Sequence, residues 1–272
     1  MSHPNRPIAF VLAASDYGPL IVNRFDYHHN KDGSGYGVGY EIFGTSTYAS
    51  QEVALVTGLL GVRRQHFGDG VVAIDCGANI GVHTIEWAKT MTGWGSVLAI
   101  EAQERIFYAL AGNISINNCF NARAIHAAIG AESGVIRIPT PDYLKPASFG
   151  SLELKRRESN EYIGQQIDYS DKSTTPVSSI TLDSLAMNRV DLLKIDVEGM
   201  EIETLTGADN LIKSFGPIIM VEWIKSPKEE IKQVLNRFNY THFEVGINLL
   251  AIHNSDPTLG HVKSTPSPAA SG

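Results

Sequence analysis

The sequence predicts an α/β fold in which helices cover both faces of a mostly parallel, seven-stranded sheet that ends in an antiparallel hairpin. Three observations support this prediction. From residue 71 onward, short apolar runs alternate with longer segments of helical periodicity, which is the pattern of a parallel sheet with crossover helices. The runs contain few polar positions, as expected of strands that are buried on both faces. Acids and glycines follow the runs directly, where turns are expected.

The first 60 residues predict an N-terminal accessory segment of short strands and a helix. The apolar run from Ile8 to Ala14 is short and poorly flanked for a signal peptide, so we expect a strand there. Glycine, tyrosine, asparagine and serine then dominate up to residue 49, which is typical of irregular structure around short strands. Residues 50–60 place four apolar side chains at helical spacing and predict a helix.

Residues 61–253 predict the main domain. Five parallel strands are expected, and they lie at residues 71–75, 96–101, 122–130, 190–196 and 217–223. Helical segments follow four of them, at residues 80–91, 104–118, 200–216 and 226–239. Two further apolar segments, 241–245 and 248–253, flank Gly246 and predict the closing hairpin.

Two polar segments stand apart from this pattern. The insertion from Pro139 to Pro176 is long, and loops of this length are usually functional or disordered. We expect it to form a lid over the acceptor of the reaction, with polar side chains that contact it; these are Tyr143, Ser148, Ser151 and Tyr162. The last residues, 254–272, have the composition of a disordered tail.

Charge argues against a nucleic-acid partner. The formal net charge is −7 and the pI is about 5.7, whereas nucleic-acid-binding domains usually present a basic surface. The densest basic cluster, residues 155–157, is flanked by Glu153 and Glu158, so we expect it to be a solvated loop.

The location of the chain is predicted from two further features. No apolar stretch approaches the ~18 residues that a membrane span requires. The two cysteines, Cys76 and Cys119, are expected to be free thiols in a reducing compartment. The sequence therefore predicts a cytoplasmic protein without a membrane span, and it makes no prediction of the oligomeric state.

The turn after the first strand of the domain predicts a ligand site. Asp75, Gly77, Asn79 and Gly81 stand between that strand and a helix, whose N-terminal N–H groups point at whatever lies there. Glu101 ends the next strand, where an acid typically accepts hydrogen bonds from ribose hydroxyls in nucleoside-binding α/β folds. A bare strand–turn–helix unit would explain the glycines alone but leaves Glu101 unexplained. We expect His83 and Trp87, on the following helix, to be packing residues.

The nucleoside is not expected to be a dinucleotide. When Gly77 is aligned with the first glycine of G-x-G-x-x-G, Asn79 occupies the second glycine position, where a side chain obstructs the pyrophosphate. No G-K-[ST] follows the turn, so a phosphate-binding P-loop is absent from it too. S-adenosylmethionine, which contains no phosphate, fits better. Its adenosine would reach Glu101, and its amino-acid end would face Asn79 and Asp75.

The same segments resemble the FkbM-type methyltransferases. The stretch AIDCGANIGVHT is similar to the family motif D-x-G-A-N-x-G-x-x-T, and KIDVEGME to K-I-D-V-E-G-x-E. SITLDSL, SFGSLEL and LAIEAQERIFYALAGNISIN are also similar to family segments, and the resemblance covers about residues 40–253. One departure is Ala102-Gln103, where the family usually has a proline after the acid.

The resemblance implies a class I methyltransferase fold and methyl transfer from S-adenosylmethionine. The implied acceptor is an oxygen, a hydroxyl of a sugar or of a polyketide-like natural product. Carried over by position, the residues implied to hold the cofactor are Asp75, Gly77, Asn79, Gly81 and Glu101. The segment 196–201 would face the reacting methyl group.

An acidic cluster follows the fourth parallel strand and contains Asp196, Glu198 and Glu201. Glu198 and Glu201 would share a helix face if the helix has begun there, and acids at a helix start also favour the macrodipole. Asp196 lies at the ligand-facing end of the sheet, and Glu222 ends the neighbouring strand. Asp196 and Glu222 could remove a proton from the acceptor or hold a divalent metal ion through oxygen ligands; the sequence favours the base and leaves the metal open.

The sequence therefore predicts an S-adenosylmethionine-dependent O-methyltransferase with Asp196, Glu198 and Glu222 as catalytic residues. Its expected partner is a small-molecule or glycan acceptor. An N-methyltransferase is disfavoured because D-V-E-G replaces the N/D-P-P-Y segment common in such enzymes. A non-catalytic nucleoside-binding module is a further alternative, which loss of the glycines or of Glu101 would have supported. A nicotinamide-dependent oxidoreductase is disfavoured by Asn79.

Overall fold

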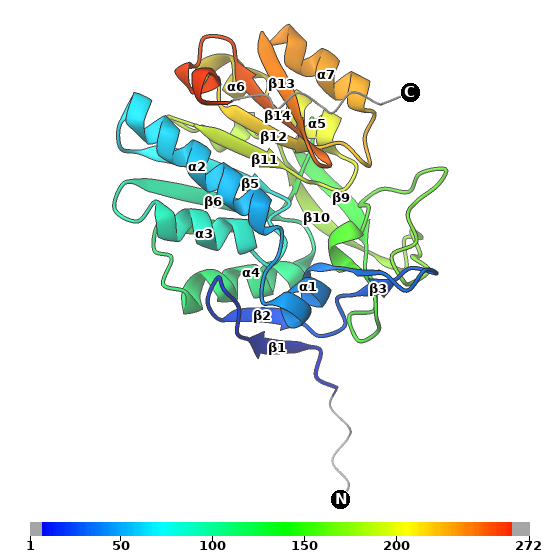
Figure 1. The fold of residues 1–272 in the computed structure, drawn as a ribbon. Helices are drawn as coiled ribbons and strands as arrows, with labels where there is room; N and C mark the ends of the chain where they lie inside the picture. The colour runs from blue at the N-terminus through cyan, green and yellow to red at the C-terminus, as the bar shows by residue number, and fades with distance from the viewer. Residues whose placement is uncertain (1–6, 263–272) are drawn as a thin grey trace, which may run out of the picture.

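The computed structural model describes residues 7–262 and confirms the predicted fold class (Figure 1). Its central sheet has seven strands in the order β13-β14-β12-β11-β5-β6-β7. The strands are β5 (Val71–Cys76), β6 (Gly95–Glu101), β7 (Ala122–His126), β11 (Leu192–Ile195), β12 (Ile218–Glu222), β13 (Tyr240–Val245) and β14 (Asn248–His253). The five strands from β12 to β7 are parallel, and β13 and β14 form the predicted antiparallel hairpin.

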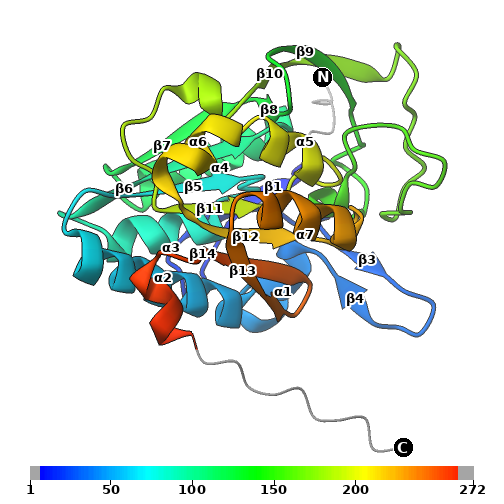
Figure 2. The same cartoon turned by 90° about the horizontal axis from the view of Figure 1, so that it is seen from above.

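Helices cover both faces of this sheet (Figure 2). One face packs against α2 (Ser50–Phe67), α3 (Val82–Thr90) and α4 (Glu104–Ile116). The other packs against α5 (Glu201–Thr206), α6 (Asp209–Phe215) and α7 (Lys228–Arg237). Side chains of one strand alternate between the two cores: Met220 joins the first and Val221 the second. This alternation explains why the strands read as continuous apolar runs.

The N-terminal segment packs onto the same domain. It comprises β1 (Phe10–Ala13), β2 (Leu20–Asn23), β3 (His28–His29), β4 (Gly35–Tyr36) and α1 (Val38–Thr45). The predicted first strand is therefore present as β1. Helix α2 runs to Phe67, so the expected boundary at residue 60 falls inside it. Val56 and Leu60 of α2 are fully buried within the core that covers the sheet.

A second, three-stranded sheet lies beside the first and was not expected. It has the order β8-β10-β9, with β8 (Ala128–Ile129), β9 (Gly134–Pro139) and β10 (Thr174–Ile180). The single strand predicted at 122–130 is therefore two strands, β7 and β8, in different sheets. The expected lid runs from β9 to β10 and contains the short helix η1 (Phe149–Ser151).

Two other predictions need correction. The helix expected at 200–216 is divided into α5 and α6, and the Gly207 carbonyl between them accepts a hydrogen bond from the Asp183 amide at 2.9 Å instead of continuing the helix. The backbone at Gly207 also approaches Gly130 so closely that a Cβ there would lie 2.1 Å from the Gly130 carbonyl oxygen. The tail predicted to be disordered from residue 254 is ordered in its first part. Asp256 is buried, forms an ion pair with Arg63 at 2.5 Å, and caps η3 (Pro257–His261). Residues 263–272 lie outside the described part.

The remaining regular element is η2 (Asp183–Leu185). Among residues 7–262, no helix has both the length and the apolar character needed to span a membrane.

Candidate functional site

A cavity of about 540 Å³ lies at the carboxyl ends of β5, β6, β11 and β12. This is the edge of a parallel sheet at which α/β folds bind ligands. Most of the predicted site residues line it, namely Asp75, Gly77, Asn79, Glu101, Asp196, Glu198 and Glu222. Gly81 caps α3 behind the lining. Of the four expected lid residues, Ser148 and Ser151 line the cavity, whereas Tyr143 and Tyr162 do not.

The glycine turn is held against the loop after β11. Gly77 has a φ of 79°, a conformation that glycine adopts without penalty. A Cβ at Gly77 would lie 1.7 Å from the carbonyl oxygen of Asp196. Close approach of two backbones, rather than turning alone, therefore requires a glycine here.

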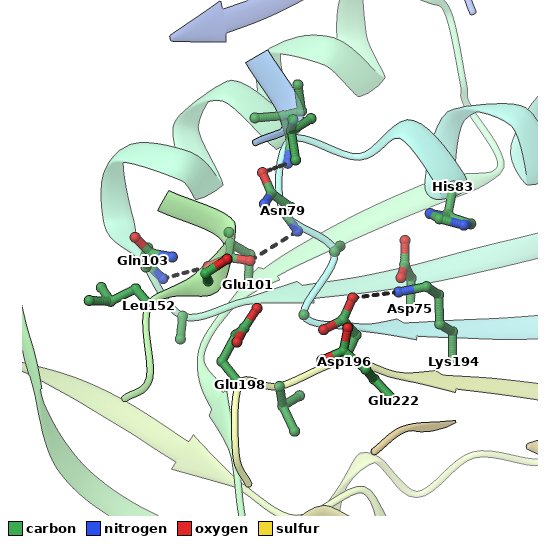
Figure 3. A pocket seen from close by; sticks show the side chains of 18 of the residues that line it. Asp75, Asn79, His83, Glu101, Gln103, Leu152, Lys194, Asp196, Glu198 and Glu222 are labelled. Atoms are coloured by element: carbon green, nitrogen blue, oxygen red, sulfur yellow. Dashed lines mark hydrogen bonds and ion pairs between the residues drawn. The ribbon is translucent and has the colours of Figure 1, made fainter. Parts of the chain in front are cut away.

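Glu101 is fixed by backbone donors and faces the cavity (Figure 3). The amide of Asn79 donates to one carboxylate oxygen at 3.0 Å, and the amide of Gln103 donates to the other at 2.7 Å. Burial raises the pKa of Glu101 to about 7, although these backbone hydrogen bonds oppose the shift. Each oxygen retains a lone pair for a further donor.

Asp75 has one satisfied and one unsatisfied oxygen. Its side chain is buried, and Oδ2 accepts a hydrogen bond from the Thr84 hydroxyl at 2.6 Å. Oδ1 is buried without a hydrogen-bond partner among the described residues. Buried polar atoms are nearly always paired, so an unpaired oxygen on a cavity wall indicates a donor supplied by a ligand.

The side of the cavity next to Glu101 is largely apolar. The residues of this wall are Ala102, Ala127, Ala128, Ile129, Leu152 and Leu154. A flat aromatic base is the kind of group that such a wall accepts.

The opposite side holds the three carboxylates predicted to be catalytic. One oxygen from each of Asp196, Glu198 and Glu222 lies within 4.8 Å of the others. Asp196 and Glu198 follow β11, and Glu222 ends the adjacent β12. The Lys194 ammonium lies 3.0 Å from Asp196, and the Lys225 ammonium lies 2.5 Å from Glu198.

Glu222 differs from its two neighbours because it has no partner. Glu222 is only 8% exposed. Within residues 7–262, its carboxylate takes part in no hydrogen bond and no ion pair. Burial raises the pKa of Glu222 to about 8, and the nearby charge of Asp196 adds to the shift. Burial likewise raises the pKa of Glu198, against the effect of Lys225.

Glu198 and Glu201 do not share a helix face, because α5 begins only at Glu201. Glu198 lies in the preceding turn with a φ of 53°. The fully buried Glu201 side chain accepts hydrogen bonds from the backbone amides of Val197 and Gly199. Glu201 therefore holds the turn in shape and leaves Glu198 directed into the cavity.

Lys194 and Glu52 were not recognised as site residues from the sequence. Glu52, on α2, lies 3.1 Å from Nε2 of His83 and 3.9 Å from the Lys194 ammonium. Although burial opposes it, the hydrogen bond from His83 and the Lys194 charge lower the pKa of Glu52 to about 2. The sequence did contain a signal for Lys194 as a site residue: it is a lysine inside the otherwise apolar run of β11, two residues before Asp196. Of the two residues expected to be packing residues, His83 lines the cavity and Trp87 is fully buried.

The loop between β9 and β10 is fastened to the cavity walls. The side-chain amide of Gln103 donates to the carbonyl of Phe149 at 2.8 Å and accepts from the Tyr143 hydroxyl at 3.0 Å. Lys225 donates to the carbonyl of Ser151 at 2.6 Å. Gln103, at the position of the departure from the family motif, therefore connects the Glu101 side of the cavity to this loop.

The chain is similar to known methyltransferases. A family model described as "Methyltransferase FkbM domain" matches residues 75–246. The curated "Methyltransferase 1" of Beauveria bassiana is 26% identical over 154 residues, which cover 53% of this chain and 61% of that protein. "Methyltransferase sdnD" of Sordaria araneosa is 25% identical over 156 residues, covering 50% and 60%. The chain thus spans about three fifths of the length of these relatives. A solved structure of Methyltransferase FkbM from Methylobacillus flagellatus has a TM-score of 0.47 and 16% identity, over 68% of this chain and 43% of that one.

Proposed function

The chain belongs to the FkbM methyltransferase family, and from this premise we propose that it transfers a methyl group from S-adenosylmethionine to a hydroxyl group of a sugar, glycan or natural-product acceptor. The observation that carries the proposal is the cavity with a nucleoside-type wall on one side and an unpaired, buried carboxylate, Glu222, on the other. Glu101 ends β6 and Glu222 ends β12, and the parallel strands β11 and β5 lie between them.

The cavity residues fit S-adenosylmethionine. Glu101 would accept the two ribose hydroxyls with the lone pairs that its backbone donors leave open. The unsatisfied oxygen of Asp75 would accept the ammonium of the amino-acid end, next to the glycine turn. When bound, the cofactor supplies an electrophilic methyl group on a positively charged sulfur.

The chain itself must position the acceptor hydroxyl and remove its proton. A general base works best when its pKa lies near the operating pH, and the pKa of Glu222, about 8, meets this condition. Asp196 is already paired with Lys194, so its part is to accept a hydrogen bond from the acceptor and orient it. This proposal keeps both predicted residues but assigns the proton to Glu222 rather than to Asp196.

A shared divalent metal ion is the alternative use of the three carboxylates. Lysines contact two of them at 3.0 Å or less, which already supplies positive charge to the cluster. The proposed mechanism therefore uses these lysines and needs no metal ion.

The proposed function is tested by incubating the purified chain with methyl-labelled S-adenosylmethionine and a panel of sugars, polyols and phenols. We expect a labelled product with an added methyl group on oxygen, identified by mass spectrometry, and loss of that product in Glu222→Gln. Labelled products on nitrogen would favour an N-methyltransferase. Cofactor binding without any transfer across the panel would favour a non-catalytic module.

A further inference from the structure

The acceptor half of the cavity is rich in carboxylates. We define it as the lining residues from 36–52, 148–151, 194–198 and 222–248, together with Glu161. The described residues contribute six of them, Glu41, Glu52, Glu161, Asp196, Glu198 and Glu222. Against these stand two lysines, Lys194 and Lys225. The excess persists when Glu198 and Glu222 are left out, because four carboxylates still face two lysines. A cavity wall of low dielectric concentrates the field of such charges.

Both lysines are already occupied by carboxylates. Lys194 lies 3.0 Å from Asp196 and 3.9 Å from Glu52. Lys225 lies 2.5 Å from Glu198 and 3.0 Å from Glu161, and it also donates to the carbonyl of Ser151. Each ammonium has only three N–H donors. Neither lysine therefore has much capacity left to bind an anionic group.

Arg157, which contacts the loops beside this wall, is occupied as well. The Arg157 guanidinium donates to the backbone carbonyls of Gly199 and Lys225, and it lies 3.6 Å from Glu153. It fastens the loop between β9 and β10 to the loops that follow β11 and β12. Its donors point at the protein rather than into the cavity.

Two carboxylates of the acceptor half have no cationic partner among the described residues. Glu222 is buried and receives neither a hydrogen bond nor an ion pair. Glu41, at the start of α1, lines the cavity and forms no ion pair. Glu222 is therefore open to a hydrogen bond from a ligand, whereas the half-buried Glu41 accepts the Ala49 amide and adds negative charge without a cation beside it.

We propose that this site selects its acceptor by charge: it binds a polyhydroxylated group that is uncharged or carries an ammonium group, and it rejects one with a carboxylate or phosphate near the reacting hydroxyl. The inference rests on the proposed function, because it concerns the acceptor of that same reaction. Sugar hydroxyls donate hydrogen bonds, and ionised carboxylates only accept them. Like charges at short range in a partly buried cavity oppose binding, so a negative acceptor finds no compensating group.

The test uses three compounds with one skeleton: glucosamine, glucose and glucuronate. Their affinities for the full chain, with S-adenosylhomocysteine bound, are measured by saturation-transfer NMR. We expect glucosamine to bind at least as tightly as glucose and glucuronate to bind at least about tenfold more weakly than glucose. The difference should shrink at high salt, because salt screens charge. The proposal is overturned if glucuronate binds as tightly as glucose, or if none of the three binds.

A double variant, Glu41→Gln with Glu161→Gln, provides the second measurement. It removes the charge of Glu41, which has no cationic partner, and the charge of Glu161, which is a partner of Lys225. Repulsion of glucuronate should therefore weaken, and we expect the ratio of glucose to glucuronate affinity to fall at least about threefold. The matched control is Glu132→Gln with Glu158→Gln, two exposed residues outside the cavity, which should leave the ratio unchanged. An equal ratio in both double variants contradicts the proposal. These measurements report binding and do not require turnover. If the affinities follow the expected order but no methyl group is transferred, the result contradicts the proposed function and leaves the charge selection standing.

Discussion

The backbone of Gly77 lies against the carbonyl oxygen of Asp196, at a distance that leaves no room for a Cβ atom between them. The contact joins the turn expected to hold the cofactor to the loop expected to hold the acceptor. This contact adds to the pairing of β5 with β11 and to the hydrogen bond from the Asp196 amide to the Cys76 carbonyl at 3.0 Å, so the two loops are held together at their bases.

Gly77→Ala should damage both halves together. The new methyl group would lie 1.7 Å from the Asp196 oxygen, and the residue would also keep a φ of 79°, so one of the two loops must move. We expect a lower melting temperature and loss of S-adenosylhomocysteine binding in calorimetry. Gly61→Ala, in α2 with open space around its Cβ position, is the control and should be neutral or slightly stabilising. Unchanged affinity in Gly77→Ala would show that the contact is not needed.

Cofactor affinity should depend on pH through Glu101. Its pKa of about 7 means that it is partly protonated near neutrality, and only the ionised form can accept two ribose hydroxyls. The affinity for S-adenosylhomocysteine should therefore rise between pH 6 and pH 8. Glu101→Gln should lower the affinity by about 10–100-fold, since a hydrogen bond to a charged group contributes about 1.5–3 kcal/mol, and should flatten the pH dependence. Calorimetry with Glu104→Gln, an exposed neighbour, should match the wild type.

Glu222→Gln should be more stable and less active than the wild type. Burial raises the pKa of this carboxyl from 4.5 to about 8 in the folded chain, so the folded state binds a proton that the unfolded chain has lost. The free energy of unfolding should fall as pH rises from about 4.5 to 8, and the variant should escape this loss. We expect it to melt higher than the wild type at pH 9, and not at pH 4.5. Its kcat should fall by about 10²–10⁴-fold, the usual contribution of a general base.

Asp196→Asn separates orientation from proton removal. We expect a smaller loss of kcat than in Glu222→Gln. Activity should still rise with pH because Glu222 still takes the proton, but the rise should move to a lower pH because the charge of Asp196 no longer raises the pKa of Glu222. A pH profile that becomes flat in Asp196→Asn would instead identify Asp196 as the base. The profile is measured with the best acceptor from the panel, at saturating cofactor.

Chelator should leave wild-type turnover unchanged, because Lys194 and Lys225 already neutralise two of the three carboxylates. The measurement is kcat after dialysis against EDTA, with and without added Mn²⁺. Loss of activity with EDTA and recovery with Mn²⁺ would show that Asp196, Glu198 and Glu222 share a divalent ion.

The central sheet and the residues that line the Glu101 side of the cavity were predictable because their signals are local. β5, β6, β11 and β12 are buried on both faces, so they read as apolar runs, and the residues directly after them lie at the ligand edge. β10 gave no such signal. Its residues alternate between buried and exposed and include Pro176, so its composition resembles that of a loop.

The acceptor side was less predictable because its residues meet only through tertiary packing. Glu52 on α2 reaches Lys194, more than a hundred residues later in the chain, and Lys225 reaches Glu161 of the loop between β9 and β10. No spacing in the sequence encodes these contacts. Asp196 and Glu222 could be identified from the sequence because they lie at strand ends. Only the structure shows that Lys194 pairs with Asp196 and that, among the described residues, no lysine pairs with Glu222.

Part of the acceptor wall comes from residues 36–52, ahead of residue 75, where the match to the family model begins. Under the proposed function, the residues that carry the reaction and some of those that contact its acceptor lie in different parts of the chain. Mutations in the N-terminal segment should then change acceptor selectivity while the strands that carry Glu101 and Glu222 stay constant. In protein engineering, residues 36–52 are therefore the segment to vary when the acceptor is to be changed and the methyl donor is to be kept.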